Sequence, residues 1–282
     1  MTLFAELWAE IWAEIWAEAR SIVIVSAFSL SLLTAIELLL PREAQSLRQR
    51  LTGLAIWACY VPLSIVIFKL FGSLWAAIGI RPLVRLPLSF DWAGIAAIVL
   101  APLAAALIYD FFFYWFHRAQ HAFAWRFHAV HHSIRELNTV NAYHHVTEPV
   151  FQAVFLLLPV SLILADTGPA VPAMLILLHL QGGFIHSSSR IDLGPLRLFL
   201  CDNRFHRIHH SVEERHFDKN FGAFTTLWDR LFGTAWFPER DEWPDTGLAE
   251  IDQPRSLRHW IDLPARLRRR GHADSPGSAL AH

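Results

Sequence analysis

The composition of this chain of 282 residues excludes an ordinary soluble domain. Hydrophobic residues make up 54% of it and charged residues 17%, compared with about 45–50% and about 25% in soluble globular domains. The formal net charge of -1 provides no basic face of the kind that nucleic-acid binding requires, so no nucleic-acid partner is expected. The chain is predicted to be an all-α integral membrane protein.

Residues 1–20 contain a four-residue tandem repeat, in which Leu7-Trp8-Ala9-Glu10 is followed twice by Ile-Trp-Ala-Glu. On a helix, this repeat places Trp and Ile or Leu opposite Glu. Because Trp favours the membrane interface, one interpretation is an amphipathic helix in the membrane plane. A neutral repeat expansion is the alternative. No basic segment precedes an apolar one, so a cleaved signal peptide is not expected.

Three apolar segments are long enough to cross a bilayer. Ser21–Leu40 contains one charge, Glu37, and twenty helical residues rise about 30 Å, the thickness of the hydrocarbon core. Leu51–Gly72 and Trp92–Trp115 are similarly apolar. The third predicted span leads directly into the first histidine of the chain.

Two shorter apolar segments, Val150–Ala165 and Val171–Ile185, flank the turn signal Asp166-Thr167-Gly168-Pro169 and are predicted to form a helical hairpin. The loop Pro41–Arg50 is rich in arginine, which favours the cytoplasmic side. The third span would then end on that side, and the hairpin would leave it and return to it. We therefore expect a transmembrane helix bundle with a cytoplasmic, helical, histidine-rich cap for two metal ions.

Thirteen of the 16 histidines lie between His117 and His216. Most of them form three groups, namely His117-x3-His121, His128-x2-His131-His132 and His206-x2-His209-His210. Imidazole is the commonest protein metal ligand, and helical residues three and four apart share a face. Eight nitrogens exceed the needs of one ion, so two metals are expected. A solvated, pH-sensitive surface is the alternative, and the repeat of His-x2-His-His argues against it.

Further motifs surround these groups. They are Asp110-x3-Tyr114-Trp115-x-His117-Arg118-x2-His121, Trp125-x2-His128-x2-His131-His132-Ser133, His206-Arg207-x-His209-His210-Ser211, Asp218-Lys219-Asn220-Phe221-Gly222 and Trp228-Asp229-Arg230-Leu231-Phe232-Gly233-Thr234. This combination closely resembles the fatty acid hydroxylase superfamily of the sterol desaturase type, from about Asp110 to Thr234. The resemblance implies a membrane-embedded di-iron oxygenase that uses O2, holds two iron ions on the cytosolic face and acts on a lipid.

The resemblance also implies the metal ligands. They are His117, His121, His128, His131, His132, His145, His186, His206, His209 and His210. His145 corresponds to the family's His-Pro-x-Glu segment because Glu148 follows three residues later. Val146 departs from that pattern, and the neighbouring His144 could substitute for His145. No catalytic residue beyond the ligands is implied.

Other polar residues are expected to play supporting or structural roles. Metal-bound imidazoles usually donate their second N–H to a carboxylate or carbonyl, and the candidate carboxylates are Asp110, Glu148, Asp218 and Asp229. We expect His179 to lie in the core or line a substrate channel. His216 is expected either to contact a metal ligand from outside or to lie at the surface, and the surface position is preferred. Cys59 and Cys201 are expected to be free thiols.

The chemistry of alkyl oxidation constrains the function. Breaking an unactivated C–H bond requires an oxidant that no side chain provides, and no haem or iron–sulfur segment is visible. Electrons are therefore expected from a ferredoxin or a b-type cytochrome with its reductase. The predicted activity is hydroxylation of a fatty acyl, sterol or related lipid, with desaturation at the same site as the alternative. A non-catalytic metal-binding or transport protein is the alternative from another class, although transporters bind near the bilayer midplane.

The chain is predicted to have one main unit, residues 21–240, with its metal-binding core at 110–234. Residues 241–282 are predicted to be a polar cytoplasmic tail, partly disordered, that contains Arg266 and Arg268–Arg270. A short solvated basic run is the preferred interpretation of these arginines, and contact with anionic lipid is the alternative. Only Lys69 and Lys219 are lysines among 24 basic residues. This arginine bias favours a bacterial protein, and hence the inner membrane.

Overall fold

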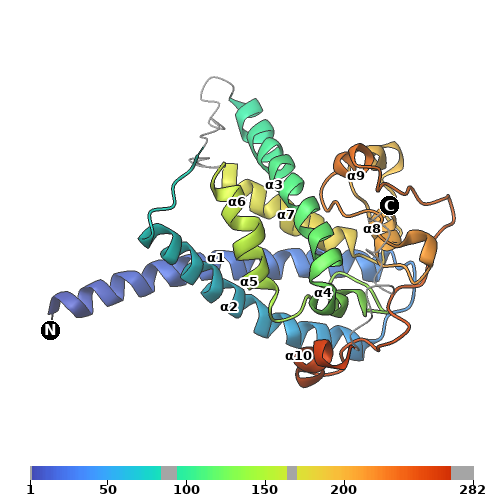
Figure 1. The fold of residues 1–282 in the computed structure, drawn as a ribbon, viewed down its shortest axis with the longest axis horizontal. Coiled ribbons are helices and arrows are strands. Elements are labelled where there is room, and N and C mark those ends of the chain that lie inside the picture. The colour runs from blue at the N-terminus through green and yellow to red at the C-terminus, as the bar shows by residue number, and fades with distance from the viewer. Residues whose placement is uncertain (1, 84–93, 164–169, 268–282) are drawn as a thin grey trace.

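The computed structural model describes residues 2–83, 94–163 and 170–267, and it consists of helices joined by loops (Figure 1). Within these ranges the extended backbone forms only isolated bridges, such as the one between Pro41 and Ser189. The prediction of an all-α membrane protein is confirmed.

Three long apolar helices make up much of the bundle. They are α1 (Thr2–Leu39), α2 (Leu47–Ala77) and α3 (Ile95–Phe123), and each is long and apolar enough to cross a membrane. Because α1 is continuous, no helix boundary separates residues 2–20 from the first span. α3 extends past the predicted Trp92–Trp115, and this places His117 and His121 on the same helix.

The two arms of the predicted hairpin are shorter helices. The first arm is built from α5 (Glu148–Gln152), the π-helical η1 (Ala153–Leu157) and α6 (Leu158–Ser161), which follow one another directly. The second arm is α7 (Ala170–Ile185). The turn signal at 166–169 lies outside the described residues. α7 packs against both α3 and α1, so it lies between these two helices.

The ends of α1, α3 and α7 meet at one end of the bundle, where short helices form a cap (Figure 1). The cap elements are α4 (Trp125–His132), η2 (Gly194–Leu198), α8 (Asn203–His209), η3 (Glu214–His216) and α9 (Leu227–Leu231). The Asp202 side chain accepts a hydrogen bond from the Phe205 N–H and so begins α8. The three histidine groups are brought together in this cap.

Glu37 connects the first span to the cap. Its side chain is buried and forms an ion pair of 2.8 Å with Arg50 of α2. Its carboxylate also accepts hydrogen bonds from the backbone N–H groups of Thr139 and Ser188, at 2.9 and 3.0 Å. A buried charge is costly unless it is paired and hydrogen-bonded, and here both conditions hold. Glu37 therefore fixes two cap loops to the end of α1.

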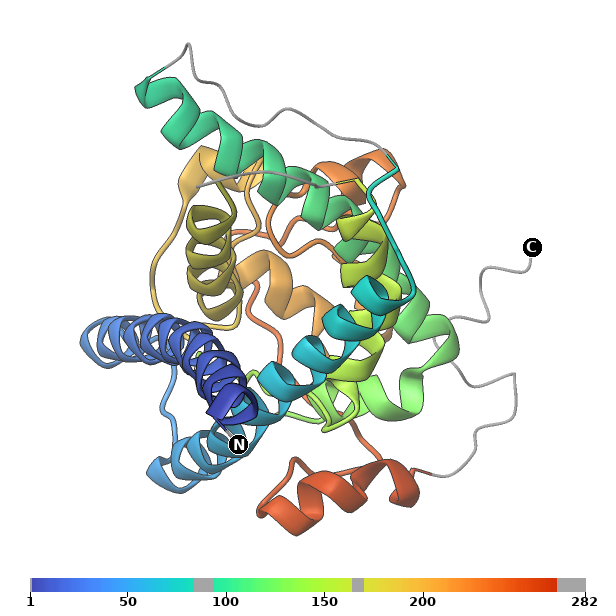
Figure 2. The ribbon, with the colours of Figure 1, turned by 90° about the vertical axis from the view of Figure 1, so that its left-hand side faces the viewer.

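The segment after residue 240 is not only a polar tail. It contains α10 (Leu257–Arg266), which lies at the outside of the bundle next to α2 and α4 (Figure 2). Trp260 and Leu263 of this helix are buried in a cluster with Ile56 and Tyr143. The predicted partly disordered end, from 268 onward, lies outside the described residues.

Candidate metal centre

The helical repeat explains why the sequence contains His-x2-His-His twice. In α4, His128 and His132 are four residues apart and face one point, whereas His131 faces another. In α8 and its C-cap, His206 and His210 form the i, i+4 pair and face the same point as His131. His209 points away from them, toward His128 and His132. Each motif thus gives ligands to two neighbouring sites.

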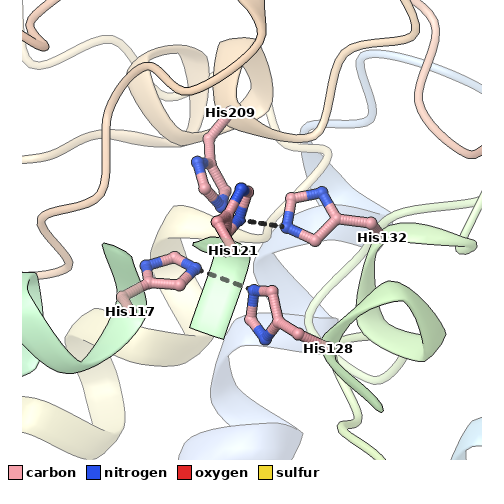
Figure 3. Close-up of side chains that lie close together, drawn as sticks. All are labelled: His117, His121, His128, His132 and His209. Carbon is pink, nitrogen blue, oxygen red and sulfur yellow. Dashed lines mark hydrogen bonds between the residues drawn. The ribbon is translucent and has the colours of Figure 1, made fainter. Parts of the chain in front are cut away.

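The first group, which we name site A, contains five histidines (Figure 3). They are His117, His121, His128, His132 and His209, all buried, with their ligand atoms within 4.8 Å of one another. The Nε2 atoms of His117 and His128 are 3.0 Å apart, and those of His121 and His132 are 3.1 Å apart. Site A therefore collects one ring from α8 and four from α3 and α4.

The second group, site B, contains His131, His186, His206 and His210, which are also buried and within 4.8 Å of one another. His186 follows α7 directly, and its Nε2 lies 3.2 Å from that of His131 and 3.0 Å from that of His206. The rings of His132 in site A and His210 in site B stack with centroids 4.6 Å apart. The two sites are therefore adjacent parts of one centre.

The segment Asp218–Phe221 orients three of the rings in site A. The Nδ1–H groups of His117 and His209 donate to the carbonyls of Phe221 and Lys219, at 2.8 and 2.7 Å, and His121 Nδ1 lies 3.3 Å from Asp218 Oδ1. Asp218 and Asn220 have φ of 56° and 59°, in the left-handed region. This unusual backbone turns successive acceptors of one short segment toward the histidines, and the Nε2 atoms of the rings are left to face the centre.

The rings of site B show that the centre fits a metal ion. His131 and His186 donate Nδ1–H to the carbonyls of Tyr143 and Gly182, so each neutral ring has a bare lone pair on Nε2. These two lone pairs face each other at 3.2 Å. Burial and, to a lesser extent, neighbouring histidines lower the pKa of His131 well below its ordinary value, and burial lowers the pKa of His186 to about 4. A proton between them is therefore disfavoured, and a metal ion would satisfy both nitrogens.

Other nitrogens in the centre lack a protein partner. His209 Nε2 and both ring nitrogens of His210 are buried without a hydrogen bond. Such groups are costly in a folded protein unless an ion or water satisfies them. Burial also lowers the pKa of His209 and His210 well below the ordinary value. Neutral rings with unpaired nitrogens are the donor set that first-row transition metals prefer.

The four predicted carboxylates differ in whether they contact a histidine ring, the backbone or another side chain. Of the four, Asp218 contacts a ligand candidate directly. Asp229 accepts from the N–H groups of Phe221 and Gly222, both at 2.8 Å, and Asp110 accepts from those of the next three residues. Glu148 instead accepts from the side chains of Gln120 and Gln152. Asp229 thus holds the end of the orienting segment, and Asp110 holds the residues that follow it, rather than a ring.

The remaining core histidines lie outside the two sites. His145 contacts Thr147 Oγ1 at 2.9 Å and the Ile261 carbonyl at 3.1 Å, so both of its ring nitrogens face protein groups. His144 lies closer to the centre and stacks on His131, with centroids 3.9 Å apart. His216 is buried and bonded to Ser211, contrary to the surface position expected for it. Sequence reasoning missed the backbone carbonyls, although the motif that supplies two of them was visible.

Membrane-length helices that end at a buried, all-histidine centre define the class: a membrane-embedded helical protein with a histidine metal site. The family model described as fatty acid hydroxylase matches residues 102–234, a range that includes every residue of sites A and B. Residues 102–234 are therefore similar to a fatty acid hydroxylase domain, and the resemblance inferred from the motifs is confirmed.

Curated relatives are enzymes named for lipid oxidation. The chain is 36% identical over 136 residues to the alkylglycerol monooxygenase of Danio rerio and 32% identical over 133 residues to that of Homo sapiens. It is 31% identical over 165 residues to the ornithine lipid hydroxylase of Rhizobium tropici. These matches cover 47%, 46% and 53% of the chain but 30%, 29% and 49% of the relatives, so the chain spans less than half of each. No solved structure matches it significantly.

Proposed function

We propose that the protein is a membrane-bound di-iron monooxygenase that hydroxylates an alkyl C–H bond of a lipid, with O2 as co-substrate. The observation that carries this proposal is the pair of adjoining all-histidine sites at the ends of apolar helices. The names of the relatives support a lipid substrate. When bound, two iron ions would supply the oxygen activation that an unactivated C–H bond requires.

The proposed ligands are the nine histidines of sites A and B. Five of these rings, those of His117, His121, His131, His186 and His209, have Nδ1 fixed by Phe221, Asp218, Tyr143, Gly182 and Lys219, respectively, so that their Nε2 atoms would hold the ions. His145 is omitted because its two ring nitrogens already face protein groups. His144 keeps the plane of the His131 ring by stacking on it. Burial of all nine rings excludes bulk water from the centre.

The alkyl chain of the lipid is proposed to lie along one face of α7. Leu175, His179, Gly182 and His186 are spaced by three or four residues, so they form a stripe that leads from site B into the span. Leu175 is 45% exposed, and a Cβ added to Gly182 would meet no atom within 4 Å. The His179 ring is held by a hydrogen bond of 3.1 Å to Ser26 of α1. A lipid entering laterally from the bilayer would fill this open face.

The histidine centre is proposed to face the cytoplasm. The loop between α1 and α2 contains Arg42, the start of α2 contains Arg48 and Arg50, and the loop lies at the same end as the cap. Positively charged loops favour the cytoplasmic side. The arginine bias of the chain supports a bacterial inner membrane.

Electrons are proposed to come from a separate ferredoxin or b-type cytochrome with its reductase, because no electron-transfer segment is visible in the sequence. The purified chain supplied with NAD(P)H alone is therefore expected to show no sustained turnover. The same preparation should turn over repeatedly when a ferredoxin and its reductase are added. Multiple turnovers without any partner would refute this part of the proposal.

The test of the function is lipid profiling of bacteria that express the chain, grown under oxygen gas enriched in the heavy isotope. The expected product is a lipid with one additional, labelled oxygen atom. The His209→Ala variant, expressed to the same level, is the control. Loss of two hydrogen atoms without oxygen gain would show a desaturase, and an unchanged lipid profile with full metal loading would favour a non-catalytic metal-binding protein.

A further inference from the structure

α10 has three distinct faces. Trp260, Leu263 and Pro264 are buried against the bundle. Leu257 and Ile261 are 38% and 51% exposed, and together with the exposed Ala265 they form a stripe spaced by four residues.

The third face of α10 is polar, with Arg258, Asp262 and Arg266. A helix that simply covers a water-soluble surface would show one buried and one polar face. The additional apolar stripe, defined by Leu257, Ile261 and Ala265, has no partner among the described residues of this chain that covers it.

The stripe is continuous with the beginning of a membrane span. Leu47 and Leu51 of α2 are 71% and 56% exposed, and they line an apolar groove together with Leu257. α2 is a candidate span from its first residue, Leu47. The stripe of α10 therefore lies at the level where α2 enters the bilayer, on the side of the histidine cap.

Basic residues surround the groove and the stripe. Arg48, Arg255, Arg258 and Arg266 are exposed near them, and the acidic groups nearby are Asp252, Asp262 and Glu136, which accepts from Ser46. The pairs Arg255–Asp252 and Arg258–Asp262 are 3.2 and 3.5 Å long and open to solvent. Exposed pairs of this kind contribute little and are readily exchanged for another anion. The surplus charge is positive.

α10 is fixed in its position by contacts with the cap. Trp260 Nε1 donates to the His144 carbonyl at 2.7 Å, and Arg126 donates to the Pro264 carbonyl at 2.5 Å. His145 also bonds to the Ile261 carbonyl. Because these contacts are made on the inner side of the helix, the apolar stripe has a fixed outward direction.

We propose that α10 is a membrane-surface helix whose stripe and groove bind anionic lipid of the leaflet beside the histidine centre. The acyl chain would lie between Leu257, Ile261 and the start of α2, and the arginines would face the lipid phosphate. An amphipathic surface helix with basic residues at its polar edge is suited to this environment. The inference is independent of the catalytic function proposed above.

The experiment uses the full chain in nanodiscs of phosphatidylcholine and phosphatidylglycerol that contain a doxyl-labelled lipid quencher. Cys59 is exposed and is replaced by serine, whereas Cys201 is buried and is kept. An environment-sensitive fluorophore is attached at Ile261→Cys or, as a matched control on the polar face, at Arg258→Cys. Quenching at position 261 is expected to be several-fold stronger than at position 258.

A second label at Leu257→Cys, on the same stripe and in the groove, repeats the measurement in case the first variant folds poorly. Equal quenching on the two faces would overturn the proposal. So would a blue-shifted emission at 261 without quenching, since protein would then cover the stripe. Nanodiscs without phosphatidylglycerol test the charge: weaker quenching at 261 is expected, and unchanged quenching would refute the preference for anionic lipid.

Discussion

His209 illustrates how one ring completes the centre. Its Nδ1–H is fixed by the Lys219 carbonyl and its Nε2 is buried without a protein partner. We expect His209→Ala to lose more than about 100-fold in product formation, because the loss of a ligand exceeds the 10- to 100-fold cost of outer contacts. Product is measured per membrane-inserted protein. His272→Ala, a change in the polar tail, is the control, and near-normal turnover of His209→Ala would exclude His209 as a ligand.

Asp218 provides a separate test of ring orientation. Asp218→Asn keeps an oxygen beside His121 Nδ1 but removes the negative charge at 3.3 Å. Metal affinity should fall by about 10-fold or more, as measured by competition with a chelator, while the protein remains folded. Glu213→Gln is a suitable control, because Glu213 is paired with exposed Arg215. An unchanged affinity for Asp218→Asn would show that this carboxylate does not influence the centre.

The grouping of the candidate ligands could be predicted from the sequence and their outer contacts could not, for a physical reason. Helical spacing brings His128 and His132 together in any helix, so the groups in the sequence already point to a centre. The acceptor for His117 is a backbone carbonyl, and every residue has one, so sequence cannot select Phe221. The choice between His144 and His145 also depends on the loop, because adjacent residues in a non-helical segment point in different directions.

Among the elements, α7 leads to a prediction about substrate size. Gly182→Leu should fill the open face beside His186 without a clash, because nothing lies within 4 Å of the added Cβ. Gly72→Leu in α2 meets equally open space and is the matched control. Both changes favour the helix by up to about 1 kcal/mol. Turnover of the proposed lipid substrate should fall about 10-fold or more for Gly182→Leu and stay unchanged for Gly72→Leu. Equal activities of the two variants would show that the alkyl chain of the lipid does not lie along this face of α7.

Element prediction succeeded where hydrophobic length decides and failed where packing decides. The three spans follow from apolar runs, and the third helix continues past its predicted end at Trp115 into the cap. α10 was not predicted, since Leu257–Arg266 contains three arginine or histidine residues in a polar context. Its helix depends on the burial of Trp260 and Leu263 against distant residues such as Ile56, which no local pattern shows.

For the whole molecule, the two sites predict metal content and metal-dependent stability. Protein purified in detergent with iron available should contain two metal ions per chain by elemental analysis, because sites A and B are separate groups of ligands. Removing the metal by chelation should lower the thermal midpoint, since an ion present at about 100 times its Kd stabilises the folded state by about 2.7 kcal/mol. One ion or none in folded, active protein would contradict the two-site interpretation.

The Glu37 junction has a consequence for biosynthesis. Its backbone partners at Thr139 and Ser188 are separated from it by 102 and 151 residues, and at about 5–20 residues per second they emerge many seconds after the first span. Arg50 follows Glu37 by 13 residues. Arg50 is therefore available as a counter-ion for the Glu37 carboxylate before Thr139 and Ser188 have been synthesised. During membrane insertion, this early pair would keep α1 and α2 together until the cap loops are synthesised.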